Sequence, residues 1–200
     1  MKEILIATKN KGKVKEFSDL FAEKGVRVSS LFDVPNVDDV EETGSTFVEN
    51  AKIKAETISK LCNKIVVADD SGLSVDALDG RPGVFSARYA GEKKNDQLNL
   101  QKVLKEMEGV PFEKRTARFQ CVLAVAIPNE ETKIFEGTCD GYITDNPDGE
   151  NGFGYDPIFY IVDKKQTMAQ LSSDEKNRIS HRANAMKKLS ENWDTITLFS

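Results

Sequence analysis

The feature that most constrains the fold is an alternation, in the first third of the chain, between short apolar runs and segments of helical periodicity. Apolar residues recurring every three to four positions predict helices, and short uninterrupted apolar runs predict buried strands. The alternation predicts these elements in chain order: strand 2–8, helix 11–24, strand 26–32, helix 46–61 and strand 65–68. Such an order is typical of an α/β fold, in which helices cover a sheet.

The second half of the chain predicts longer strands and fewer crossovers. The expected elements are helix 96–108, strands 115–127 and 132–144, strand 158–160 and helix 174–192. The polar break at 128–131 suits a hairpin turn between the two long strands. We therefore expect a mixed central sheet flanked by helices, while the pattern leaves the strand order undefined.

Composition narrows the class of protein. A chain of 200 residues suits one domain, or two closely joined lobes. Hydrophobic residues make up 39% and charged residues 30%, which is typical of soluble globular proteins. The formal net charge of −5 argues against a general nucleic-acid binder, because such proteins carry basic faces that neutralise phosphates. We expect no nucleic-acid partner.

Cysteine spacing and hydropathy predict the compartment. The three cysteines, Cys62, Cys121 and Cys139, are far apart and form no C-x-x-C pair. They are expected to be reduced thiols in a cytoplasmic protein. The N-terminal residues lack the apolar stretch of a signal peptide, and no run of about 18 apolar residues occurs, so we expect no membrane partner.

A polar, lysine-rich segment joins the first expected strand to the first expected helix. Its residues are Thr8, Lys9, Asn10, Lys11, Gly12 and Lys13. The N-terminus of a helix attracts anions through its unpaired N–H groups and its dipole, so this junction suits a phosphate. The segment is no P-loop, since G-x-x-x-x-G-K-[ST] occurs nowhere in the chain. The alternative is an ordinary capped helix with solvated lysines.

Two acidic segments indicate a cation site. Asp69 and Asp70 directly follow the apolar run 65–68, where we expect the strand to end in a turn at Ser71 and Gly72. Carboxylates at such a strand end are suited to holding Mg²⁺ or orienting a water molecule. Glu41, in the acidic loop before the second helix, could join Asp70 around one cation. The alternatives are a plain Asp-Gly turn and solvated loop charges.

Two segments near the C-terminus suit a base-binding site. The glycine-rich loop Gly152–Pro157 carries two aromatic residues and Asp156, and aromatic rings can stack on bases. His181 and Arg182 follow on the last expected helix. A single histidine cannot build a histidine-rich metal site, which favours oxygen-ligated Mg²⁺ or Mn²⁺ over zinc. The alternative is a turn-forming loop with a surface His-Arg pair.

Taken together, these segments resemble the inosine triphosphate pyrophosphatase family, also called the XTP/dITP pyrophosphatases. The matching segments occur in order along nearly the whole chain. They are Thr8-x-Asn10-x-x-Lys13 with Glu16, Glu41-Glu42-Thr43-Gly44-x-Thr46-Phe47-x-Glu49-Asn50-Ala51-x-x-Lys54-Ala55, Ala68-Asp69-Asp70-Ser71-Gly72-Leu73, Pro82-Gly83-Val84-x-Ser86-Ala87-Arg88-Tyr89, Phe153-Gly154-Tyr155-Asp156-Pro157-Ile158-Phe159 and Glu175-Lys176-Asn177-x-Ile179-Ser180-His181-Arg182.

The resemblance implies one elongated α/β domain over residues 1–200 with two lobes and a nucleotide cleft between them, and a homodimer. It implies hydrolysis of noncanonical purine triphosphates such as ITP, dITP and XTP to the monophosphate and pyrophosphate, which cleanses the nucleotide pool. It also implies roles for individual residues. Asp70 would be the catalytic base, Glu41 and Asp70 the Mg²⁺ ligands, and the substrate-binding residues Thr8, Lys9, Asn10, Lys11, Gly12, Lys13, Ser71, Phe153, Gly154, Tyr155, Asp156, Lys176, His181 and Arg182.

Two alternatives remain open at this point. One is a Maf-like pyrophosphatase acting on other modified nucleotides, which has a similar fold. The other is a sensor that binds nucleotides without hydrolysing them and would not need both Glu41 and Asp70. Within the pyrophosphatase interpretation, a base pocket rich in hydrogen-bond donors would favour 6-oxo purines, because the amino group of adenine would face those donors unpaired.

Overall fold

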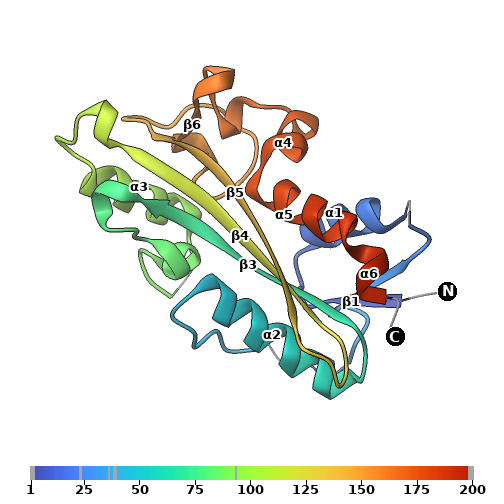
Figure 1. The fold of residues 1–200 in the computed structure, drawn as a ribbon. Helices are drawn as coiled ribbons and strands as arrows, with labels where there is room; N and C mark the ends of the chain where they lie inside the picture. The colour runs from blue at the N-terminus through green and yellow to red at the C-terminus, as the bar shows by residue number, and fades with distance from the viewer. Residues whose placement is uncertain (1–2, 23, 36, 38–39, 93, 198–200) are drawn as a thin grey trace. The chain divides into compact units, whose positions relative to one another are not determined.

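The computed structural model describes residues 3–197 except 23, 36, 38–39 and 93. Residue 2 of the first expected strand and residue 23 of the first expected helix lie outside the described residues. Figure 1 shows long strands with helices packed along them. The α/β prediction of a mixed sheet flanked by helices is confirmed.

Within the described residues, the strands form one sheet of seven in the order β2-β1-β3-β4-β5-β6-β7. Its strands are β1 (Glu3–Ile6), β2 (Arg27–Ser30), β3 (Val66–Val75), β4 (Thr116–Ala126), β5 (Lys133–Ile143), β6 (Phe159–Ile161) and β7 (Gln166–Thr167). Strand β1 runs parallel to β2 and β3, whereas β6 runs antiparallel to β5 and β7, so the sheet is mixed.

The helices follow the local signals in the sequence. They are α1 (Lys11–Ala22), α2 (Phe47–Cys62), α3 (Asp96–Glu106), α4 (Ser173–Ile179), α5 (His181–Glu191) and α6 (Trp193–Thr197). Thr46 caps α2 by accepting from the Glu49 N–H at 3.1 Å, and Asn95 caps α3 by accepting from the Leu98 N–H at 3.0 Å. These side chains satisfy N–H groups that have no partner inside the helix. In the described part of the chain, no helix is both long and apolar enough to cross a membrane.

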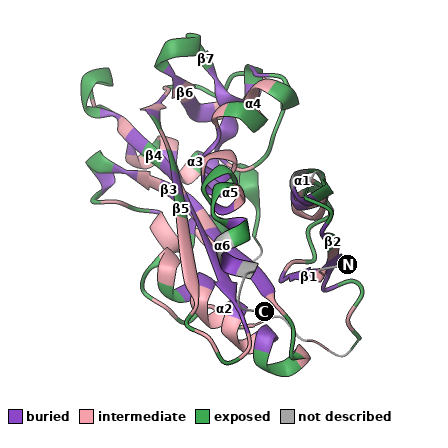
Figure 2. Cartoon of the chain, turned by 45° about the vertical axis from the view of Figure 1, so that its right-hand side comes forward, coloured by how far each residue is buried: buried purple, intermediate pink, exposed green. Residues whose placement is uncertain are grey.

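The chain divides into two compact units. Unit 1 comprises residues 1–70, 122–137 and 185–200, and unit 2 comprises residues 71–121 and 138–184. Each unit has its own apolar core, and Figure 2 shows the buried residues concentrated along the strands and on one side of the helices. In unit 1 the core packs α2 against β1, β3 and β4 through side chains that include Leu5, Ala51, Ala55, Ile58, Val66 and Val122.

The core of unit 2 packs α3 against the remaining parts of the long strands. Its buried side chains include Leu73, Leu100, Val103, Phe119, Ile143 and Phe159. The rings of Phe119 and Phe159 lie 4.4 Å apart between centroids. Burial of these large aromatic and aliphatic groups supplies the main stabilising free energy of such a unit, at roughly 25 cal/mol for each Å² of apolar surface removed from water.

Two sequence-based expectations about element ends are wrong. Strand β3 does not end in a turn at Asp69–Gly72 but continues to Val75, because Leu73 and Val75 are fully buried and extend the apolar strand. The expected helix 174–192 is broken at Ser180, whose backbone is extended (φ −65°, ψ 155°). The Ser180 hydroxyl accepts from the Ala183 N–H at 3.2 Å, so this serine starts α5 where α4 has ended.

Candidate active site

Polar side chains in the segment between β1 and α1 accept hydrogen bonds from nearby backbone N–H groups. Oδ1 of Asn10 accepts from the N–H groups of Gly12 at 2.9 Å and Lys13 at 3.2 Å. Thr8 accepts from the Asn10 N–H at 3.1 Å. The capped-helix expectation therefore describes the local geometry, and the side chains of Lys9 and Lys11 are exposed.

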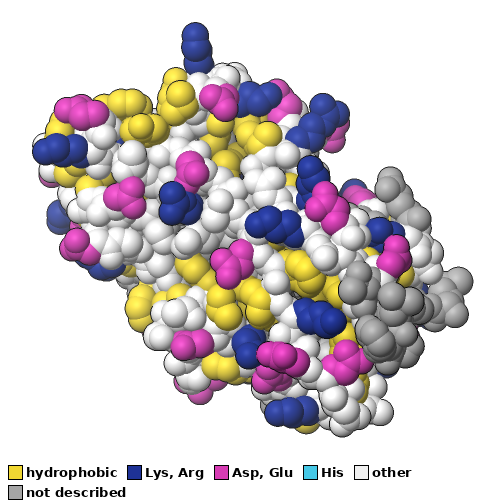
Figure 3. Space-filling view, viewed as in Figure 1, with side chains coloured by type: hydrophobic (Ala, Val, Ile, Leu, Met, Phe, Trp, Pro, Cys, Tyr) yellow, Lys and Arg dark blue, Asp and Glu magenta, His cyan; other side chains and the backbone are white. Residues whose placement is uncertain are grey.

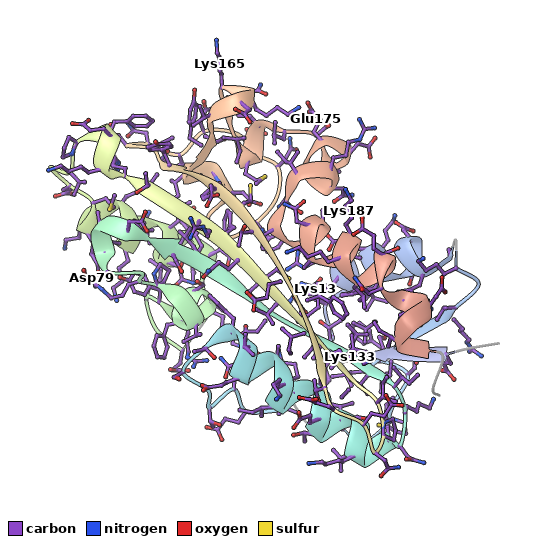
Figure 4. All side chains as sticks on the ribbon, viewed as in Figure 1. Lys13, Asp79, Lys133, Lys165, Glu175 and Lys187 are labelled. Carbon is purple, nitrogen blue, oxygen red and sulfur yellow. The ribbon has the colours of Figure 1, made fainter. Side chains whose placement is uncertain are left out.

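The side chain of Lys13, in the first turn of α1, points to a buried carboxylate on β3. Its ammonium lies 2.7 Å from Oδ2 of Asp69, whose side chain is only 2% exposed (Lys13 is labelled in Figure 4). A charge this far from water requires a partner of opposite charge. The ion pair therefore brings the lysine-rich segment and β3 together within unit 1.

Asp70, the next residue of β3, is also buried. Burial raises the pKa of its carboxyl from 3.8 to about 6, and the negative charge of Glu42 adds to this rise. The positive charge of Lys54 and a hydrogen bond from Asn50 act in the opposite direction. A carboxyl whose pKa lies near neutrality is suited to proton transfer, and such perturbed groups cluster at functional sites.

Helix α2 supplies the two groups that face this carboxylate. Asn50 and Lys54 are four residues apart and so lie on the same face of the helix. Oδ1 of Asn50 accepts from the Gly44 N–H at 2.7 Å, which leaves its amide nitrogen to donate to Asp70. One buried amide thus connects the acidic loop to β3.

The ammonium of Lys54 lies among the negative charges of Asp69, Glu42 and Asp70. It forms an ion pair with Glu42 and donates to the backbone oxygen of Asp69 at 3.0 Å. Burial alone would lower the pKa of this ammonium, but the charges of Asp69 and Glu42 outweigh it and raise the pKa above its ordinary value. Lys54 therefore remains protonated and compensates part of the negative charge in unit 1.

Of the two neighbouring glutamates, it is Glu42 and not Glu41 whose charge raises the pKa of Asp70, and the side chain of Glu41 is exposed. Glu42, Asn50 and Lys54 were missed as site residues, although their spacing was visible in the sequence. In the described part of the chain, no three acidic, histidine or cysteine side chains form a ready-made metal site. The oxygen donors nevertheless fit a hard cation, because added positive charge would relieve the repulsion that raises the pKa of Asp70.

In unit 2 the glycine-rich loop is held by Asp156. Oδ2 of this buried carboxylate accepts from the Phe153 N–H at 2.9 Å and from the Lys176 ammonium at 2.5 Å. The same ammonium lies 4.6 Å from the centroid of the Phe153 ring, which is 56% exposed. Gly152 has φ +78°, and a Cβ there would come within 2.0 Å of Oδ2 of Asp156, so only glycine fits. The loop thus presents one aromatic face beside a fixed ammonium.

Tyr155 and Gly154 point to other parts of unit 2. The Tyr155 hydroxyl is buried and donates to the Ser86 carbonyl at 2.7 Å, and burial raises the pKa of this phenol. The Gly154 N–H donates to Oδ2 of Asp96 at 2.9 Å. Neither Ser86 nor Asp96 was singled out as a site residue from the sequence, and Ser86 was visible only as part of the matching segment at 82–89.

The structure brings Ser71, His181 and Arg182 together with the core of unit 2. Arg182 donates to the Ser71 hydroxyl at 3.3 Å. The His181 ring stacks on Phe119 with centroids 4.9 Å apart and planes at 15°. Both His181 and Arg182 are buried, so the alternative of a surface His-Arg pair is wrong. Lys176 lies on α4, which begins at a capping box between Ser172 and Glu175 (Glu175 is labelled in Figure 4).

Comparison with known proteins identifies the family of this chain. The chain matches the family model described as the Ham1 family over residues 4–192. It is 62% identical over 196 residues to a protein of Geobacillus kaustophilus named dITP/XTP pyrophosphatase, covering 98% of this chain and 96% of that protein. A protein of Bacillus subtilis with the same name is 61% identical over 191 residues, covering 96% of each.

A solved structure has the same fold. The Ham1 protein of Staphylococcus aureus superposes with a TM-score of 0.91 at 48% identity, covering 98% of this chain and all of that chain. The family model and the curated relatives span nearly the full length of the sequence. The matched length includes the candidate site residues of unit 1 and those of unit 2. The chain therefore belongs to the Ham1 family.

Proposed function

We propose that this protein hydrolyses noncanonical purine nucleoside triphosphates (ITP, dITP and XTP) to the nucleoside monophosphate and pyrophosphate. The proposal is supported by the names of its relatives and by family membership. The observation that carries it is the group of buried charges in unit 1, where Asp70 with its raised pKa is accompanied by the Lys13–Asp69 and Lys54–Glu42 ion pairs. The proposed hydrolysis would remove noncanonical nucleotides from the nucleotide pool.

The triphosphate is bound by the segment from Thr8 to Lys13. Lysines and the N-terminus of a helix supply positive potential for the several negative charges of a triphosphate. The side chains of Lys9 and Lys11 are exposed and supply positive charge for phosphate oxygens, and the Lys9 ammonium also donates to the Val37 carbonyl at 3.4 Å. Lys13 carries its positive charge next to Asp69 and so adds to the potential beside β3.

Asp70 accepts a proton from the attacking water as the α–β phosphoanhydride bond breaks and pyrophosphate leaves. A carboxylate suits this role because its pKa of about 6 leaves it largely ionised at neutral pH while making it more basic than an ordinary aspartate. Glu41 and Asp70 would hold Mg²⁺, whose chemistry is to neutralise charge on the phosphates. The hydrogen bond from Asn50 holds the Asp70 carboxylate in one orientation.

The base is bound by the residues of unit 2. The exposed ring of Phe153 offers a face for stacking, and the Lys176 ammonium beside it offers a hydrogen-bond donor. With His181 and Arg182, these donors favour a base with an oxygen at position 6, as in hypoxanthine and xanthine. Adenine has an amino group there, which cannot accept from these donors and would leave them unpaired.

We further propose that the activity depends on Mg²⁺, which Mn²⁺ can replace. The protein is then a homodimer located in the cytoplasm. We also expect no nucleic-acid partner, and basic and acidic side chains of the described residues are interspersed on the face drawn in Figure 3. The membership in the Ham1 family favours this activity over a Maf-like one. Light scattering on the purified protein tests the dimer directly.

The deciding experiment incubates the purified protein with ITP, XTP, GTP and ATP, with and without Mg²⁺, and identifies the phosphate product. We expect pyrophosphate from ITP and XTP, only with the cation present, and little product from GTP and ATP. Release of orthophosphate would mean that a different bond is cleaved. Binding of ITP without turnover would support the nucleotide sensor instead.

A further inference from the structure

The glycine-rich loop of unit 2 is hydrogen-bonded to two neighbouring segments through the side chain of Tyr155 and the backbone of Gly154. Tyr155 is buried, and its hydroxyl donates to the Ser86 carbonyl at 2.7 Å. The N–H of the preceding Gly154 donates to Asp96 on the first turn of α3 at 2.9 Å. The two residues between Phe153 and Asp156 are therefore fixed from outside the loop.

Ser86 belongs to a segment that is itself anchored to β3. Its hydroxyl accepts from the Leu73 N–H at 2.9 Å and donates to the Gly83 carbonyl at 2.6 Å. Leu73 lies two residues after Ser71 in the same strand. The path from Tyr155 through Ser86 thus connects the loop that carries Phe153 with the strand that carries Ser71.

Helix α3 contacts both the glycine-rich loop and the segment that contains Ser86. Asn99, three residues after Asp96, is buried, accepts from the Ala90 N–H at 2.7 Å and donates to the Ala87 carbonyl at 3.1 Å. Residues three apart lie on the same face of a helix. One face of α3 therefore fixes the Ser86 segment through Asn99 and the glycine-rich loop through Asp96.

We propose that Tyr155 and Asp96 are positioning residues that hold Phe153 and the Asp156–Lys176 pair in the geometry that binds the purine base. This inference rests on the proposed function and assigns Tyr155 a role different from direct substrate contact. Its hydroxyl already has an acceptor in the protein and its ring is buried, whereas Phe153 presents its ring to the solvent. A binding group gains affinity when its conformation is fixed before the ligand arrives, because less entropy is lost on binding.

The test compares Tyr155→Phe, which removes only the hydroxyl, with Tyr142→Phe. Tyr142 lies on β5, where its ring stacks on Phe112 at 5.0 Å between centroids, and is outside the base-binding loop. For Tyr155→Phe we expect KM for ITP, and the dissociation constant of IMP measured by calorimetry, to rise on the order of tenfold. Inhibition by pyrophosphate, which has no base, should change less than about twofold, and kcat should stay near that of the wild type.

A second pair of variants tests Asp96. Asp96→Ala removes the acceptor for the Gly154 N–H and is expected to weaken IMP binding in the same way, while Asp96→Asn keeps an acceptor oxygen and should restore most of it. Unchanged IMP binding in Tyr155→Phe and Asp96→Ala would overturn the inference while leaving the proposed function intact. Equal weakening of IMP and pyrophosphate would also overturn it, since it would indicate general damage to the fold.

Different results would contradict the proposed function and this inference. A wild-type protein that binds IMP but hydrolyses no purine triphosphate contradicts the proposed function, while the calorimetric comparison still decides the roles of Tyr155 and Asp96. A wild-type protein that neither hydrolyses ITP nor binds IMP contradicts both. Thermal unfolding of each variant shows whether the folded state has been retained in the assay.

Discussion

The ammonium of Lys13 lies 2.7 Å from the buried carboxylate of Asp69, directly before the proposed catalytic residue Asp70 in β3. Because Asp69 is nearly inaccessible to water, the lysine compensates a charge that the solvent cannot. The same ammonium also adds positive potential beside the proposed triphosphate-binding segment. The pair therefore links the stability of unit 1 to its proposed binding of the triphosphate.

Lys13→Met should destabilise the protein by about 2–4 kcal/mol, because it leaves the buried Asp69 carboxylate without one of its compensating charges. Urea denaturation at pH 7 measures the change in the free energy of unfolding. The matched control is Lys15→Met on the same helix, where the partner Asp19 is exposed. Exposed pairs contribute little, so the control should unfold close to the wild type. Equal unfolding midpoints for both variants would contradict the structural role of Lys13.

Asp70→Asn should abolish turnover and stabilise the protein at neutral pH. The folded-state pKa of about 6 lies above the ordinary value of 3.8, so the folded state prefers the protonated carboxyl. Stability is therefore lost as the pH rises from about 4 to about 6, and the loss above that range reaches about 3 kcal/mol at 1.36 kcal/mol per pKa unit. Asparagine carries no such charge, so its advantage should be full at pH 8 and vanish near pH 4.

Urea denaturation in the presence of EDTA, repeated from pH 4 to pH 8, measures this difference between Asp70→Asn and the wild type. Asp79→Asn is the control, because Asp79 is exposed and adopts a left-handed backbone conformation that asparagine also tolerates (it is labelled in Figure 4). An Asp70→Asn protein that is less stable than the wild type at pH 8 would show that the carboxylate is a net stabilising group.

The pH dependence of kcat/KM for ITP should report the ionisation of Asp70. Activity requires the carboxylate, so kcat/KM should fall about tenfold per pH unit on the acidic side of a pKa at or below about 6, since bound Mg²⁺ favours the charged form. Glu42→Gln removes a negative charge that raises this pKa, and the acidic limb should move to lower pH.

Glu41→Gln distinguishes the two neighbouring glutamates. If Glu41 holds Mg²⁺, its substitution should raise the Mg²⁺ concentration for half-maximal activity by tenfold or more, with little shift of the acidic limb. The comparison uses the same titration of Mg²⁺ at pH 8 for both variants. A larger change in the Mg²⁺ requirement for Glu42→Gln would transfer the ligand role to Glu42.

Gly152→Ala should weaken the binding of ITP, because the new Cβ would come within 2.0 Å of the Asp156 carboxylate that holds Lys176. Gly109→Ala is a matched control, since Gly109 has nearly the same backbone angle (φ +77° against +78°) but no atom within 4 Å of the added Cβ. Both variants incur about 1–2 kcal/mol of backbone strain. Only Gly152→Ala should raise KM for ITP in steady-state assays, and equal KM values would contradict the steric argument.

Local signals in the sequence predicted those elements whose stability is itself local. Helix α2 begins after Thr46 as expected, because the capping residue and the apolar side chains of Ala51 and Ala55 are recognisable without knowledge of the fold. The extension of β3 to Val75 was not predictable, since the burial of Leu73 depends on distant parts of unit 2. An Asp-Asp-Ser-Gly segment favours a turn until such packing outweighs that preference.

The sequence predicted several of the residues in the candidate site, but not how their side chains are connected. The resemblance placed Asp70, Lys176 and Arg182 among the functional residues. It did not indicate that Asn50 joins the acidic loop to β3, or that Glu42 acts on Asp70 more than Glu41 does. Such relationships depend on side-chain directions in three dimensions, which the spacing along a chain does not define.

The continuation of β3 through Asp70 has a consequence for how the proposed base is held. The residue lies in the middle of a ten-residue strand, and this strand occupies an interior position of the sheet rather than an edge. Interior strands are usually the last parts of a protein to open during native-state hydrogen exchange, whereas catalytic groups on loops exchange early. The backbone amide of Asp70 should therefore exchange with deuterium only through unfolding of the whole unit, so the proton acceptor is held in place before any nucleotide binds.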